Sequence, residues 1–184
     1  MLANLRALFG VVVDIVLLRR GPENLPASLP VLVITVALYA VIASFVASSV
    51  APPEENWALS IATVIVVTLA WYHVALRLAN KRERFLQTLT AMFAVQVLFA
   101  PLRMPVVSAL MVQARAYEEN KIPPSTSLTL LALFIMLWQF VVTVRIIRAA
   151  FEWTWFPAVI LALAQEFAML LVLAALLGGT APPT

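Results

Sequence analysis

The sequence predicts an all-α membrane protein, a polytopic helical bundle of five transmembrane helices preceded by an N-terminal amphipathic interfacial helix. Of its 184 residues, 64% are hydrophobic and only 11% are charged, and an ordinary soluble domain carries about twice that charged fraction. Five apolar runs come near or exceed the roughly 20 residues that a helix needs to cross a bilayer. These observations exclude a soluble globular domain and a disordered chain, and they predict a single membrane domain over residues 1–184.

Residues 1–20 are predicted to form a helix that lies in the membrane interface. Their apolar side chains share one helical face, while Arg6, Gly10 and Asp14 recur at four-residue spacing on another. The apolar run that ends before Arg19 has twelve residues, which is too short to span and suits an interfacial helix. A secretory signal is one alternative, which Asp14 disfavours because it interrupts the apolar stretch. A re-entrant or docked helix is the other.

Residues 21–30 are predicted to form a proline-rich connector. Pro22, Pro26 and Pro30 lack a backbone amide and restrict the residues that precede them. The segment should therefore end the first helix and run extended along the membrane surface. Pro30 is suited to the first turn of the span that follows.

The predicted spans follow the apolar runs in chain order. They cover residues 31–51, 57–76, 85–112, 128–144 and 153–177. The predicted outer loops, 52–56 and 115–127, are short.

The third span is predicted to be broken near residues 101–105, where Pro101 and Pro105 flank Arg103. Proline in a span leaves carbonyl groups without their helical donors. One interpretation is a discontinuous helix with a binding site at the break. The other is a span that ends near Pro101, with Arg103 reaching the outer interface. An unbroken helix over 85–112 would measure about 42 Å, against about 30 Å of hydrocarbon.

The placement of basic residues predicts the orientation. If the N-terminus is cytoplasmic, nine arginines and lysines lie in cytoplasmic segments and two lie outside, a bias typical of the inner side. The C-terminus is then outside, and Trp71 and Tyr72 belong to the inner aromatic belt. The scarcity of lysine beside abundant arginine and alanine favours a bacterial inner membrane. The nine residues are Arg6, Arg19, Arg20, Arg77, Lys81, Arg82, Arg84, Arg145 and Arg148.

Polar side chains on three spans are predicted to share one layer near the middle of the membrane. They are Gln96, Gln139, Gln165 and Glu166, with Arg103 about 10 Å farther out. Such residues are costly in hydrocarbon and need a partner or a purpose. One interpretation is a hydrogen-bonded clamp between helices. The other is a proton or ion path, or a polar substrate site, centred on Glu166.

Small residues at four-residue spacing predict close helix contacts. Ala40, Ser44 and Ser48 form one such stripe, and Ala158 with Ala162 forms another. Small residues let helix backbones approach closely. The stripes predict packing within the bundle or self-association, and the spacing does not choose between them.

Several classes of function are disfavoured by what the sequence lacks. It contains no cysteine and one histidine, so a metal site is not expected and no cofactor is predicted. It holds no nucleophile elbow, zinc-protease motif or phosphate-binding loop, so an enzyme is not expected. The basic residues adjoin apolar runs instead of forming a face for nucleic acid, so the expected partners are membrane lipids, a second copy or another membrane protein.

The layout resembles the Yip-domain family of small membrane proteins. The matching features are the amphipathic stretch Leu2 to Leu18, the lead Arg20-Gly21-Pro22-Glu23-Asn24-Leu25-Pro26, and the five apolar runs. The D-L-Y-G-P-type signature of eukaryotic members is not present, although Gly21-Pro22 is similar to part of it. The resemblance implies a non-enzymatic role in membrane organisation or partner binding, and it identifies no functional residue.

The sequence therefore predicts a scaffold, a membrane-organising protein or an accessory subunit of a membrane complex. The alternative is a small transporter or proton-coupled subunit that uses Glu166 and Arg103.

Overall fold

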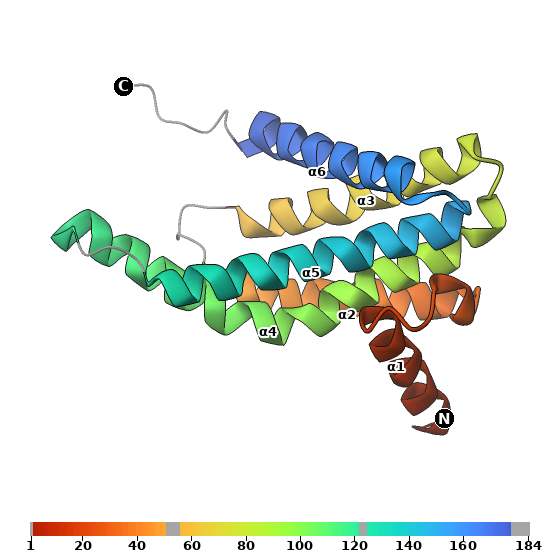
Figure 1. The fold of residues 1–184 in the computed structure, drawn as a ribbon, viewed down its shortest axis with the longest axis horizontal. Coiled ribbons are helices and arrows are strands. Elements are labelled where there is room, and N and C mark those ends of the chain that lie inside the picture. The colour runs from red at the N-terminus through yellow and green to blue at the C-terminus, as the bar shows by residue number, and fades with distance from the viewer. Residues whose placement is uncertain (1, 51–55, 122–124, 178–184) are drawn as a thin grey trace.

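The computed structural model describes residues 2–50, 56–121 and 125–177, and it confirms the all-α prediction. The helices appear along the chain in Figure 1. They are α1 (Leu2–Val16), α2 (Leu29–Val50), α3 (Trp57–Leu78), α4 (Phe85–Asn120), α5 (Thr126–Phe151) and α6 (Trp155–Leu177), with short 3-10 turns η1 (Pro22–Asn24) and η2 (Arg82–Arg84).

Five of these helices, α2 to α6, are long and apolar enough to cross a membrane, as an integral membrane protein requires. The fourth predicted span is longer than expected, because α5 continues from residue 144 to Phe151. Arg145 and Arg148 were expected to mark a loop. Arginine is a good helix former, and its long side chain can reach polar surroundings while the backbone stays helical.

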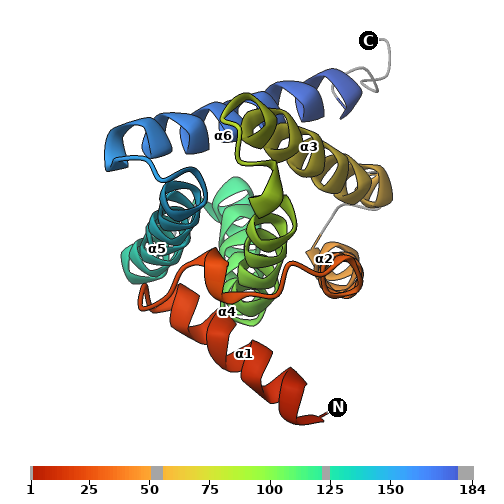
Figure 2. The same cartoon turned by 90° about the vertical axis from the view of Figure 1, so that its right-hand side faces the viewer.

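Helix α4 lies at the centre of the bundle. It packs against α2, α5, α3 and α1, and α6 completes the bundle by packing on α5 and α3. Figure 2 shows α4 surrounded by the other helices. The segments 17–28, 79–84 and 152–154 meet at one end of the bundle (Figure 1). We call this the basic end, because eight of the nine arginines and lysines assigned to the inner side lie in or beside these segments.

Tight packing is concentrated in the half of the bundle next to the basic end. In α5 the buried side chains lie between Val142 and Phe151. In α6 the buried residues among those described are Ala158 and Ala162, both within its first eight residues. Large apolar side chains farther along, such as Phe167, stay exposed in the isolated chain. A bilayer would cover these side chains, since lipid tails are as apolar as they are.

Helix α1 lies across the direction of the other helices (Figure 1), and its last turn docks on the bundle. Ile15 is fully buried, and Trp138 Nε1 donates a hydrogen bond to the Val16 carbonyl at 3.2 Å. Trp138 belongs to the middle of α5, so the contact fixes the end of α1 on the side of that helix. This supports the docked alternative for the C-terminal part of α1, and its position in the membrane interface stays a prediction.

The three polar-face residues predicted on α1 differ in their surroundings. Arg6 and Gly10 are exposed. Asp14 is half-buried, and its Oδ2 lies 3.1 Å from Nε of Arg20. The Asp14 carbonyl also accepts the amide of Arg19 at 2.8 Å. The helix therefore ends in a turn that Asp14 and Arg20 hold closed.

The connector was predicted to be extended, but it contains a short 3-10 turn. Pro22 begins the η1 turn, where its fixed φ suits the first helical position. Gly21, Pro22 and Leu25 are buried, and Gln87 Nε2 of α4 donates to the Leu25 carbonyl at 2.7 Å. The connector is thereby attached to the basic end of α4.

The predicted break in the third span is wrong, because α4 continues through Pro101 and Pro105 to Asn120. Neither proline ends the helix, although each removes one ladder hydrogen bond. Prolines are tolerated in membrane helices when neighbouring groups compensate for the lost bond. Figure 1 shows α4 changing direction along its length, as expected for a helix with internal prolines.

Candidate functional site

A cavity of about 770 Å³ lies between α4, α5 and α6. Its lining is mostly apolar, with five polar or charged side chains: Gln96, Arg103, Gln139, Thr143 and Glu166. Four of the five residues predicted to share a polar layer therefore meet at one cavity. Thr143 was not predicted, because a single threonine in an apolar run carries no signal of its own.

The two glutamines of the cavity form a clamp between helices. Gln139 Nε2 on α5 donates to Gln96 Oε1 on α4 at 2.9 Å. Both side chains are half-buried, so each satisfies part of the other's hydrogen-bonding need. Bonds of this kind between membrane helices stabilise by ~0.6–2 kcal/mol.

Gln165 is the one predicted layer residue that lies apart from the cavity. Its Oε1 accepts a hydrogen bond from the Tyr72 hydroxyl on α3 at 2.6 Å. Tyr72 is fully buried, so it does not belong to an interfacial aromatic belt. Sequence reasoning missed this pair, because 93 residues separate the two partners and only the packing of α3 on α6 brings them together.

Arg103 lies on the unbroken α4, and its half-buried side chain lines the cavity. This arrangement differs from both sequence-based interpretations, because the helix is neither interrupted at Arg103 nor ended before it. Tyr39 on α2 is an electrostatic neighbour of the guanidinium. Tyr39 itself packs on Phe93 of α4, with ring centroids 5.3 Å apart.

Glu166 lines the same cavity from α6, one turn after Leu163. Its side chain is exposed in the isolated chain. In the part of the chain that the structure describes, no nitrogen of Arg103 lies within 4.0 Å of the Glu166 carboxylate. The cavity thus holds a guanidinium group and a carboxyl group that make no direct contact with each other.

The predicted small-residue stripes are used unequally. Ala158 and Ala162 are fully buried, so α6 approaches its neighbours closely there. On α2, Ala40 and Ser44 are half-buried and Ser48 is exposed. The Ser44 hydroxyl donates to the Ala40 carbonyl at 2.7 Å, so it serves its own helix.

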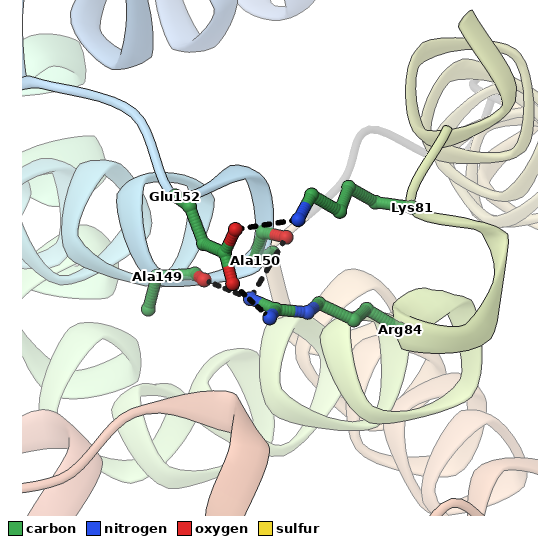
Figure 3. A network of polar contacts seen from close by, with 5 residues as sticks. All are labelled: Lys81, Arg84, Ala149, Ala150 and Glu152. Carbon is green, nitrogen blue, oxygen red and sulfur yellow. Dashed lines mark hydrogen bonds and ion pairs between the residues drawn. The ribbon is translucent and has the colours of Figure 1, made fainter. Parts of the chain in front are cut away.

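An ion-pair network closes the basic end between the α3–α4 turn and the end of α5 (Figure 3). Lys81 and Arg84 each bond one carboxylate oxygen of Glu152, and Arg84 Nη1 also donates to the Ala149 carbonyl at 2.8 Å. The hydrogen bond from Lys81 and then that from Arg84 hold the pKa of Glu152 below its ordinary value. The carboxylate therefore stays ionised at neutral pH.

Within the described residues, no group of three or more histidine, cysteine, aspartate or glutamate side chains is placed to hold a metal ion. Comparisons with protein families, with curated proteins and with solved structures find no match for this chain.

Proposed function

We propose that this chain is a non-enzymatic integral membrane protein, a membrane-organising protein or an accessory subunit of a membrane complex. Its α4–α5–α6 cavity would receive polar side chains of a partner membrane protein. The observation that carries the proposal is that Arg103 and Glu166 line one cavity without pairing. Charged groups at membrane depth need a partner, and a second protein with complementary side chains would supply one for each.

The geometry of the remaining polar groups supports the same proposal. Gln96 and Gln139 satisfy each other, and Gln165 is bonded to Tyr72. These bonds act as clamps that hold the bundle in shape. They leave Arg103 and Glu166 as the polar groups of the layer that the bundle does not use for its own packing.

The proposal is tested by purification in mild detergent after native expression. We expect a stoichiometric partner that is lost from Glu166→Leu and from Arg103→Leu, because removing one side of a buried charge pair costs about 2–5 kcal/mol. Glu83→Leu is the matched control, since Glu83 is an exposed carboxylate of η2 away from the cavity. Equal recovery of the partner with all three variants would contradict the proposal.

The cavity volume favours a second candidate function, a small transporter or proton-coupled subunit. A cavity of about 770 Å³ falls in the range of small-molecule sites. Purified protein in liposomes would then move a solute or protons by itself, and Glu166→Gln would abolish that flux. Flux that survives Glu166→Gln would exclude a proton path through Glu166, while a stable monomer that transports would exclude the accessory-subunit proposal.

We also propose a bacterial inner-membrane location, with the basic end cytoplasmic and the C-terminus outside. The clustering of arginine at one end of the bundle supports this orientation through the positive-inside rule. The chain lacks cysteine, so cysteines introduced at Arg82 and Arg115 should label from opposite sides, and labelling from one side would contradict the orientation.

A further inference from the structure

A second cavity lies at the basic end and is separate from the one between α4, α5 and α6. It measures about 500 Å³. The connector contributes Glu23, the α3–α4 turn contributes Arg84, and the last turns of α5 contribute Arg145 and Arg148. Glu152 and Trp153 complete it from the α5–α6 turn. Three segments that are distant in the sequence, at residues 23, 84 and 145–153, thus converge on one basic pocket.

One side of this pocket is already neutralised and held in place. Arg84 is committed to Glu152 and to the Ala149 carbonyl, and Lys81 takes the other carboxylate oxygen of Glu152 (Figure 3). Basic side chains at the C-terminal end of a helix also interact favourably with its terminal carbonyls. We therefore regard the Arg84 side as a fixed wall, with its hydrogen-bonding groups directed at the protein.

The other side of the pocket carries two arginines whose charge no carboxylate of the described residues neutralises. Arg145 and Arg148 are three residues apart on α5, which puts them on one helical face, and both are half-buried. Among the described residues, neither lies within 4.0 Å of a carboxylate. Arg148 Cζ lies 5.0 Å from the centre of the Trp155 ring, a contact that orients the guanidinium without neutralising it.

The charge balance of the pocket favours an anion. Counting Lys81, four cations stand against two carboxylates, and Glu152 already has two cationic partners. A guanidinium presents a planar pair of donors that matches two oxygens of a phosphate. Basic pockets between membrane helices at the cytoplasmic face bind the headgroups of anionic lipids, and Trp153 at the rim is a residue typical of the membrane interface.

We propose that this pocket binds the phosphate group of an anionic ligand through Arg145 and Arg148. The ligand is either the headgroup of an anionic phospholipid or a soluble phosphate compound, because both present the same oxygens. The site is independent of the Arg103 and Glu166 cavity, so it stands or falls separately from the proposed function.

The test uses the full-length protein in a neutral detergent. The melting temperature is titrated with dioctanoyl phosphatidylglycerol, with dioctanoylglycerol as the phosphate-free control, and with sodium phosphate against sodium chloride at equal ionic strength. Apparent affinity follows from the shift in melting temperature, because a ligand that binds only the folded state raises stability with the logarithm of its free concentration relative to its Kd. Native mass spectrometry counts the lipid molecules retained.

We expect phosphatidylglycerol or phosphate to stabilise the wild type, and Arg145→Gln/Arg148→Gln to weaken that binding about tenfold or more. Arg77→Gln/Arg82→Gln removes the same charge at the same end outside the pocket, and it should change binding less than about twofold. A response to phosphatidylglycerol alone assigns a lipid, and a response to both ligands assigns the phosphate group as sufficient.

Three results would overturn the proposal: no stabilisation of the wild type by either phosphate ligand, undiminished binding in Arg145→Gln/Arg148→Gln, or equal weakening in both double variants. If the glutamine pair does not fold, Arg145→Lys/Arg148→Lys replaces it. Lysine keeps the charge and loses the planar pair of donors, so this variant should bind about threefold or more weakly. Unchanged affinity of the lysine variant would then overturn the proposal.

Discussion

The half of the bundle beside the basic end and the half beyond it differ in how they are held together. Beside the basic end, the interior side chains are buried, the connector is hydrogen-bonded to Gln87, and the α3–α4 turn is ion-paired to Glu152. In the other half, the described parts of α5 before Val142 and of α6 after Ala162 bury no side chain fully. The polar cavity with Arg103 and Glu166 reaches into this half.

The difference indicates that the two halves of the bundle contribute unequally to the stability of the fold. Stability is not uniform across a protein, and segments that bind or move belong to the less stable part. The half beside the basic end defines the fold and the topology. The other half leaves many large apolar side chains exposed, and both charged members of the polar layer lie there.

The largest difference in the free energy of unfolding is expected between substitution of a core residue and substitution of a cavity residue. Ile147→Ala removes a fully buried side chain beside the basic end, and it should lower the free energy of unfolding by about 2–5 kcal/mol through the packing defect it leaves. Leu163→Ala, at the edge of the cavity, should cost about 0.5 kcal/mol. Reversible unfolding in mixed micelles measures both, and equal losses would remove the distinction between the two halves.

A smaller effect should come from the clamp between α3 and α6. Tyr72→Phe removes the hydroxyl that donates to Gln165, and it should cost ~0.6–2 kcal/mol, the range for side-chain bonds between membrane helices.

Tyr39→Phe is the control for this measurement, since the Tyr39 hydroxyl makes no hydrogen bond within the described residues. The same unfolding experiment should show a smaller change for it. A loss as large as that of Tyr72→Phe would mean that ring packing, and not the hydrogen bond, explains the result.

The smallest effect should be the pH dependence of the ion pairs at the basic end. The pKa of Glu152 is lowered from its ordinary value of 4.5 by Lys81 and Arg84. Its contribution to stability is therefore complete above about pH 4.5 and is lost as the pH falls through the lower folded-state pKa. Melting temperatures between pH 3 and 6 should fall less steeply for Glu152→Gln than for the wild type.

Glu83→Gln is the matched control for the pH experiment, since Glu83 lies in the α3–α4 turn at the same end of the bundle and makes no ion pair among the described residues. It should keep the wild-type slope. If Glu152→Gln kept that slope as well, the Lys81–Glu152–Arg84 network would not stabilise the fold.

The number of membrane helices and their approximate positions could be predicted, because length and apolarity are local properties of a segment. The continuation of α5 past Arg145 and of α4 past Pro101 could not. At Pro101 the residue type predicts an end, and neighbouring groups compensate for the lost hydrogen bond. At Arg145 the charge ends the apolar run, but the helix itself continues to Phe151. The docking of α1 through Trp138 depends in the same way on a contact between distant segments.

The polar layer was predictable only in part. Depth along a helix can be counted from the sequence, so Gln96, Gln139 and Glu166 were expected at similar levels. Depth gives no rotation about the helix axis, which is why Gln165 was expected with the others and instead bonds to Tyr72 on α3. The basic pocket was missed for a related reason, because each of its arginines alone is indistinguishable from a residue that only sets topology.

Arg103 lies between the two prolines of α4, Pro101 and Pro105, where the helix can bend most easily. About 15 residues of helix follow Pro105, an arm of roughly 22 Å. A change of about 10° in the bend therefore displaces the tip of that arm by about 4 Å. A group that bound the Arg103 guanidinium would contact α4 between its two prolines, the place where a small change in bend moves the far end of the helix most.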